Sequence, residues 1–179
     1  MPTMEPGMTR SIPFRDRSRR LPGLLLLLLL FWSGLAASDV RNEIRKTILS
    51  YNRTLIEAAK NPDFLKSFDD RRKFEPFAEK RVAQKLYIWI KSWHENNLYM
   101  DADLRSIDFK RIDIAGDQAT AVTNEVWVYR YFRHLDVNET AEAYAPTKIE
   151  YRVRYSLAND SGRWKITKID VLSETEQRL

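Results

Sequence analysis

Hydrophobic residues recur at helical spacing in the first part of the chain that follows a leucine-rich segment. From Asp39 onward they lie three or four positions apart with charges between them: Val40, Ile44, Ile48, Tyr51, Leu55 and Ala59. This period predicts an amphipathic helix. The helix is expected to end at Asn61–Pro62, because the residue before a proline disfavours the helical conformation, and Pro62–Asp63 to begin a turn or a short second helix.

A further helix, rich in aromatic residues, is expected to begin near Pro76 and to end at Asn96–Asn97, since proline suits a first helical turn. Its apolar face combines two sets of residues: Phe77, Val82, Leu86, Ile90 and Trp93, widened by Tyr87, Ile88 and Trp89. We expect this face to pack in the core. The alternative is an exposed interaction patch made by Tyr87, Trp89 and Trp93 with Tyr99 and Met100.

Beyond Asp103 the period changes to two, which is typical of strands. Residues 107–110 alternate first, and residues 112–114 continue after a slip of one position. Turn residues at 115–117 and 159–162 separate the runs 118–133 and 140–157 and a last strand that contains Trp164, Ile166, Ile169 and Val171. Helices followed by a four-stranded antiparallel meander predict an α+β fold in which the helices cover one face of the sheet.

The first 38 residues have the layout of an export signal or a membrane anchor. Five arginines precede seven consecutive leucines, Leu24–Leu30, and small residues follow up to Ser38. The uncharged stretch from Leu21 to Ser38 is at the short end of the ~17–25 residues that span a bilayer. Two interpretations stay open: a signal peptide cleaved after Ala37 or Ser38, or an uncleaved anchor with its arginines inside. Either places one domain, residues 39–179, in the periplasm or outside the cell, or outside the cytoplasm on the inner membrane.

Charge and composition narrow the function classes. The chain carries 30 basic and 25 acidic residues, and residues 1–38 hold five and two of these, which leaves 25 and 23 for the domain. A balanced surface of this kind does not favour nucleic-acid binding. The chain has no cysteine and two histidines, His94 and His134, so neither a disulfide framework nor a zinc site is expected, and we predict no metal and no cofactor.

The order of elements resembles the nuclear transport factor 2-like superfamily over residues 39–172. The most specific pieces are the alternating strand 151–157 and the terminal Gly162-Arg163-Trp164-Lys165-Ile166. The resemblance implies N-terminal helices packed on a curved sheet that forms a cone. The open end of that cone serves members of the superfamily as an enzyme pocket, a ligand cavity or a protein-docking site. It also implies that a homodimer through the outer sheet face is possible.

Aromatic residues alternate along strands that should pair, so one sheet face is expected to carry Trp127, Tyr129, Tyr131, Tyr151 and Tyr155. They form either the core beneath the helices or the wall of a binding groove. We take them as tentative ligand- or partner-binding residues.

Two titratable residues join this tentative set. Glu125 is expected on a solvated face with the charges of Arg152 and Arg154, but it is the first choice of general base if it points inward. His94, at the end of the aromatic helix, is either such a base or a cation near a helix C-terminus.

The sequence therefore favours a non-catalytic binding or scaffolding domain that docks a protein, peptide or apolar ligand on a concave sheet. We name no catalytic residue. One alternative is an isomerase, dehydratase or cyclase of the same fold. Another is an inner-membrane assembly component that resembles type IV secretion subunits, with membrane contact through residues 1–38.

Overall fold

The computed structural model describes residues 22–136 and 139–179, and the side chains from residue 38 onward except those of 136–138. The chain divides into two units, residues 1–37 and 38–179, and the following description concerns the second. The predicted signal or anchor, residues 1–38, lies almost entirely outside the described side chains and stays a prediction. Within the described part of the chain, no helix has both the length and the apolar character that a membrane crossing requires.

Two α-helices and two short 3₁₀ helices precede the sheet. They are α1 (Pro22–Lys60), η1 (Pro62–Leu65), η2 (Phe68–Phe74) and α2 (Lys80–Glu95). The end of α1 and the short helix after Pro62 confirm the sequence-based expectation. The expected start of the aromatic helix near Pro76 is wrong. The backbone of Phe77 and Glu79 instead bonds to Ile166 at 2.9 Å in both directions, so this segment is extended and α2 begins only at Lys80.

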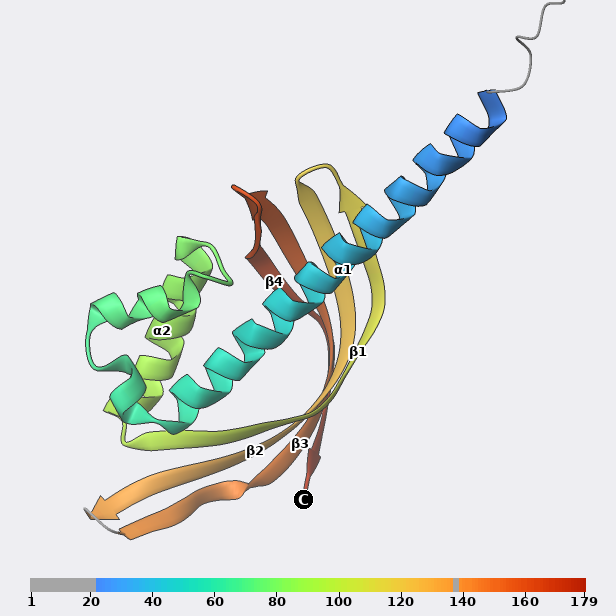
Figure 1. Ribbon diagram of the computed structural model, residues 1–179. Coiled ribbons are helices and arrows are strands. Elements are labelled where there is room, and N and C mark those ends of the chain that lie inside the picture. Colours follow the sequence, from blue (N-terminus) through green and yellow to red (C-terminus); the bar gives the residue numbers. More distant parts are fainter. Residues whose placement is uncertain (1–21, 137–138) are drawn as a thin grey trace, which may run out of the picture. The chain divides into compact units, whose positions relative to one another are not determined.

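The sheet is a four-stranded antiparallel meander with the order β1-β2-β3-β4. Its strands are β1 (Leu98–Ala115), β2 (Gln118–Asp136), β3 (Glu139–Asp160) and β4 (Arg163–Arg178). The slip of one position in β1 is a bulge between Phe109 and Arg111, and a second irregularity lies between Leu104 and Ser106. Bulges bend and twist strands, and Figure 1 shows the sheet strongly curved around the helices.

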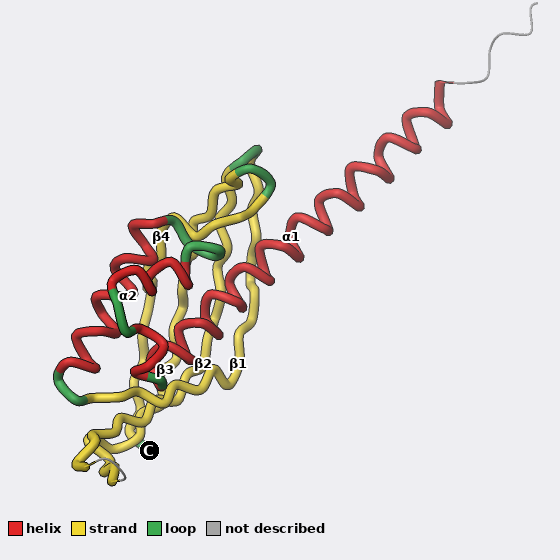
Figure 2. The backbone as a smooth tube through the Cα atoms, turned by 60° about the vertical axis from the view of Figure 1, so that its left-hand side comes forward, coloured by secondary structure: helices red, strands yellow, loops and turns green. Residues whose placement is uncertain are grey.

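The predicted α+β fold is confirmed: the helices of residues 38–179 lie on the concave side of an open sheet (Figures 1 and 2). The main core joins Ile44, Ile48, Phe74 and Ile90 from the helices to Leu157 and Ile166 from the sheet, and all are at most 2% exposed. A smaller cluster lies farther along the concave face and contains Ala59, Met100, Ala102 and Trp127.

Candidate functional site

The aromatic residues predicted to share a sheet face do share it. Along β2, the rings of Trp127 and Tyr129 stack with centroids 5.8 Å apart, and those of Tyr129 and Tyr131 are 6.3 Å apart. In the register of β2 and β3, Tyr151 lies opposite Glu125 and Tyr155 opposite Ala121. Trp127 and Tyr155 are 4% and 2% exposed, so this part of the row belongs to the core.

Glu125 lies on the concave face and not, as expected, among the solvated charges. It is 3% exposed, and both carboxylate oxygens accept hydrogen bonds. Oε1 accepts from Thr123 Oγ1 at 2.7 Å and from Tyr155 Oη at 2.8 Å, and Oε2 accepts from Trp127 Nε1 at 2.9 Å. The physical reason for the inward position is this set of three donors, which replaces water around the carboxylate.

The tyrosines around Glu125 keep their protons at neutral pH. Burial, with a smaller contribution from the Glu125 carboxylate, raises the pKa of Tyr155 well above its usual value. Burial likewise raises the pKa of Tyr129, and it raises that of Tyr151 to about 12. Tyr155 therefore acts as a hydrogen-bond donor to Glu125 and not as a base, while its own oxygen receives a 3.5 Å contact from Asn52 Nδ2.

The aromatic row ends in an open groove of about 410 Å³, here called the aromatic groove. It is lined by residues of α2, β2, β3 and β4: Trp93, Tyr131, Tyr144, Ala145, Thr147, Ile149, Glu176 and Arg178. Trp93 stacks on Tyr131 at 5.2 Å, and Tyr144 meets Tyr131 edge-on at 5.8 Å. Tyr144 is 55% exposed, and the neighbouring Trp89, 5.9 Å from Trp93, is 43% exposed. The groove thus offers flat rings to the solvent.

His94 is held by a neighbouring helix and does not belong to the Glu125 network. Its Nε2 lies 3.1 Å from the carbonyl oxygen of Ala59 near the end of α1, and its ring stacks on Tyr99 at 5.2 Å. Burial lowers the pKa of His94; the bond to Ala59 opposes this shift and the charge of Lys91 adds to it. No hydrogen bond joins His94 to Glu125 among the described residues, so the structure does not assemble the two candidate bases into one site.

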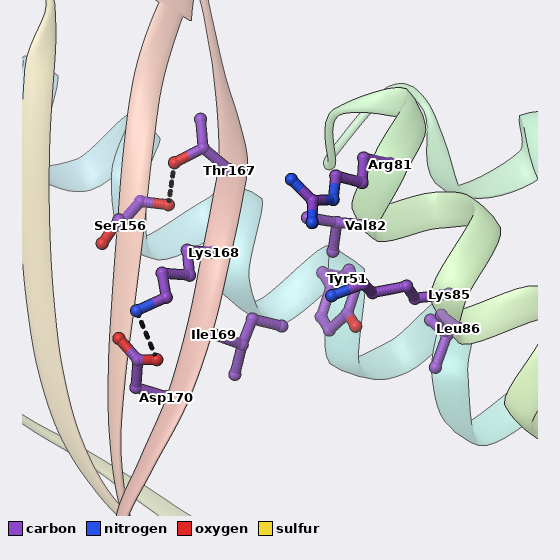
Figure 3. Close-up of a pocket in the computed structure, with 10 residues that line it drawn as sticks. All are labelled: Tyr51, Arg81, Val82, Lys85, Leu86, Ser156, Thr167, Lys168, Ile169 and Asp170. Atoms are coloured by element: carbon purple, nitrogen blue, oxygen red, sulfur yellow. Dashed lines mark hydrogen bonds and ion pairs between the residues drawn. The ribbon is translucent and has the colours of Figure 1, made fainter.

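A second opening, here called the basic cleft, lies between α2 and β4 and was not predicted from the sequence. It has a volume of about 780 Å³ and its lining includes Tyr51, Arg81, Lys85, Leu86, Thr167, Lys168, Ile169 and Asp170. Figure 3 shows Arg81 and Lys85 reaching from α2 toward β4, with Tyr51 between the two elements. The only sequence signal was the spacing of the two cations, because residues four positions apart share one helix face.

Metal binding has no support in this geometry. No group of three or more metal-ligating side chains gathers among the residues that the structure describes. The carboxylate of Glu125, the most enclosed acidic group of the site, is surrounded by donors and not by further ligands.

Comparison with known proteins places the fold but not the activity. No protein-family model matches the sequence, and no curated protein matches it. A solved structure that does match is the crystal structure of the intermembrane space region of the chloroplast protein ARC6. It is 15% identical, has a TM-score of 0.55, and the match covers 72% of this chain and 92% of that chain. At this identity the likeness shows a distantly related fold alone.

Proposed function

We propose that residues 39–179 form a non-catalytic binding domain that docks a protein or peptide outside the cytoplasm, on a fold of the nuclear transport factor 2-like type. The observation that carries this proposal is the aromatic groove. A row of stacked rings leaves the core at Trp127 and ends at Tyr144, which is more than half exposed. Exposed aromatic clusters with polar rims are typical of protein-binding surfaces.

The rim of the groove supports a peptide as the occupant. Glu176 and Arg178 line the groove from β4, and Thr147, which pairs with Arg178, lines it from β3. These groups can pair with the main chain or with charged side chains of a peptide, while Trp93, Tyr131 and Tyr144 receive an apolar or aromatic anchor residue.

The enzyme alternative finds less support in the same geometry. Both oxygens of Glu125 are already occupied by Thr123, Tyr155 and Trp127, and the side chain is 3% exposed. A substrate would have to displace one of these donors before the carboxylate could take a proton from it. The proposal therefore places binding in the groove and a structural role at Glu125.

The location of the domain follows from the N-terminal segment in this proposal. A cleaved signal would release the domain into the periplasm, and a retained anchor would hold it on the inner membrane as part of an assembly. The matching part of ARC6 is an intermembrane space region, which is compatible with a domain outside the cytoplasm.

Peptide selection tests the docking function. A displayed peptide library is selected on the full chain in detergent and counter-selected on the Trp89→Ala/Tyr144→Ala variant. We expect enriched peptides that carry an aromatic or large aliphatic residue, and affinity for the variant weaker by about tenfold or more, since aromatic anchors dominate such interfaces. Titration of each synthetic peptide, followed by fluorescence anisotropy, measures the affinity.

A matched control separates the groove from exposed apolar residues in general. Leu135 and Val171 are 59% and 56% exposed and do not line the groove, so the Leu135→Ala/Val171→Ala variant should keep wild-type affinity. The proposal is wrong if no peptide is enriched on the wild type, or if the enriched peptides bind the groove variant as well as they bind the wild type.

A further inference from the structure

The outer edge of β4 is paired at one point and open beyond it. On one side β4 pairs along its length with β3. On the other side, the described residues supply a single bridge, in which the extended segment Phe77–Glu79 pairs in parallel with Ile166. From Thr167 onward this edge offers main-chain N–H and C=O groups that no described residue uses. An open edge of this kind is a template for another strand.

The basic cleft lies directly beside the open part of this edge. Four consecutive residues of β4, from Thr167 to Asp170, line one side of the cleft, and α2 provides the other side. The cleft therefore begins one residue after the position where Phe77–Glu79 ends its pairing. Its volume of about 780 Å³ lies within the ~300–1,000 Å³ typical of ligand sites.

Two positively charged side chains of α2, Arg81 and Lys85, face this edge and are accessible to a ligand. Arg81 and Lys85 are exposed, and neither takes part in an ion pair among the described side chains of residues 38–135 and 139–179. Lys168, by contrast, is held by Asp170 at 2.8 Å. Figure 3 shows the Arg81 and Lys85 side chains directed across the cleft toward β4. Beneath them, the buried Tyr51 and Leu86 provide an apolar floor.

We propose that the basic cleft binds an extended acidic peptide, which adds to the outer edge of β4 as a fifth strand. The main chain of the peptide bonds to residues 167–170, and one alternate set of its side chains faces α2 because side chains alternate along a strand. Carboxylates in that set meet Arg81 and Lys85. The pairing of Phe77–Glu79 with Ile166 is the same interaction made by the chain itself.

The strand edge favours a peptide over an anionic lipid surface. A lipid headgroup can use the two cations, but it has no main chain to pair with β4. The site is independent of the aromatic groove, which is lined by the other end of β4, so either proposal can fail without the other.

The test uses a fluorescein-labelled peptide of three Glu-Val repeats, blocked at both ends, and the full chain in detergent. We expect binding at low ionic strength that weakens as salt is added, because the charges are partly exposed. Hydrogen exchange should slow for amides within residues 167–170 on binding. Two further peptides, each methylated on one alternate set of backbone nitrogens, keep the charges but remove main-chain donors, and at least one should bind about tenfold more weakly or worse.

Charge variants locate the site. Arg81→Glu/Lys85→Glu should weaken binding by about tenfold or more. Arg53→Glu/Arg133→Glu makes the same change in net charge at exposed residues that do not line the cleft, and it should change the affinity by less than about twofold.

Four outcomes would overturn the proposal. The first is the absence of peptide binding, including a chain that binds phosphatidylserine-containing vesicles and not the peptide. The second is equal binding of the peptide to both charge variants. The third is that both methylated peptides bind the wild-type protein as tightly as the unmethylated peptide does. The fourth is that amide hydrogen exchange at residues 167–170 does not change on binding.

Discussion

Two parts of the concave face, adjacent along β2, differ in how far they are covered. From Ala119 to Thr123 the face is covered by helices, and Ala119 and Ala121 are 6% and 0% exposed. From Trp127 to Tyr131 the face carries large rings that stack on one another and end at the exposed Tyr144. Small side chains leave room for the helices to pack closely, whereas the row of rings continues into an open groove. Glu125 lies between the two parts.

This difference separates stability from recognition. The helix-covered part holds the fully buried residues Ile44, Phe74, Leu157 and Ile166, whose burial stabilises the domain. The aromatic part instead ends in an exposed ring, that of Tyr144, which is 55% exposed and can meet a partner. Substitutions in the two parts should therefore change different properties.

The largest effect is expected in the helix-covered part. Leu157 is fully buried, so Leu157→Ala should lower the free energy of unfolding by about 2–5 kcal/mol, through lost apolar burial and the cavity that remains. Urea denaturation followed by circular dichroism measures the change. Leu135→Ala, at a residue 59% exposed on β2, is the control and should stay within about 0.5 kcal/mol. Equal losses for both variants would contradict the division.

The next effect concerns Glu125 at the boundary. Glu125→Ala removes the acceptor of Thr123, Trp127 and Tyr155, and we expect a loss of about 2–3 kcal/mol because buried donors are left without partners. Glu125→Gln should cost less, since its amide oxygen still accepts. Glu150→Ala, at an exposed residue bonded to Lys148 at 2.6 Å, should change stability by less than about 1 kcal/mol. A Glu125→Ala variant as stable as the wild type would remove the structural role.

A smaller, pH-dependent effect is expected at His94. Burial lowers its pKa in the folded protein, so below the unfolded value of about 6.5 the unfolded chain binds the proton more readily. The stability is complete above that pH, falls as the pH decreases through it, and stops falling below the folded pKa. His94→Gln keeps a donor for the Ala59 carbonyl but does not titrate. The urea midpoint of the wild type minus that of His94→Gln should therefore decrease from pH 7.5 to 5.5. The same difference at both pH values would contradict the prediction.

The smallest effect on stability is expected for the exposed rings in and beside the aromatic groove, where Tyr144 lines the groove and Trp89 contacts Trp93 next to it. Trp89 and Tyr144 are 43% and 55% exposed, so Trp89→Ala and Tyr144→Ala should each cost less than about 1 kcal/mol, mainly through the edge-on ring contacts. The same denaturation experiment measures this change. A loss as large as that of Leu157→Ala would show that these rings belong to the core, and the groove would then lose its status as a binding surface.

Local patterns predicted most of the fold. The period of three to four residues predicted a helix from Asp39, and the proline after Asn61 predicted its end; the end is confirmed, whereas α1 begins earlier, at Pro22. The slip of one position near Lys110 corresponds to a bulge in β1. The start of α2 could not be obtained in this way, because Phe77 and Glu79 pair with Ile166, a residue almost 90 positions away. Such a distant partner has no local signature.

The candidate residues likewise divide into those that a local pattern placed and those whose position depends on distant partners. Alternation placed Trp127, Tyr129 and Tyr131 on one face, as the structure confirms. Glu125 has the same parity as these aromatic residues, but its charge, with those of Arg152 and Arg154, led us to expect it on a solvated face. Only the three donors that surround it make burial of the carboxylate acceptable. The hydrogen-bond partner of His94 is the carbonyl oxygen of Ala59, which lies on another helix and has no local signature in the sequence.

The periods of helix and strand were sufficient to establish the order of the elements, the antiparallel meander and the shared face of the aromatic row. Where that row is covered and where it opens depends instead on how α1 and α2 lie against the curved sheet. The same packing places Arg81 and Lys85 across from the edge of β4, more than 80 residues later in the chain. Contacts between distant segments create both openings, and no local pattern records them.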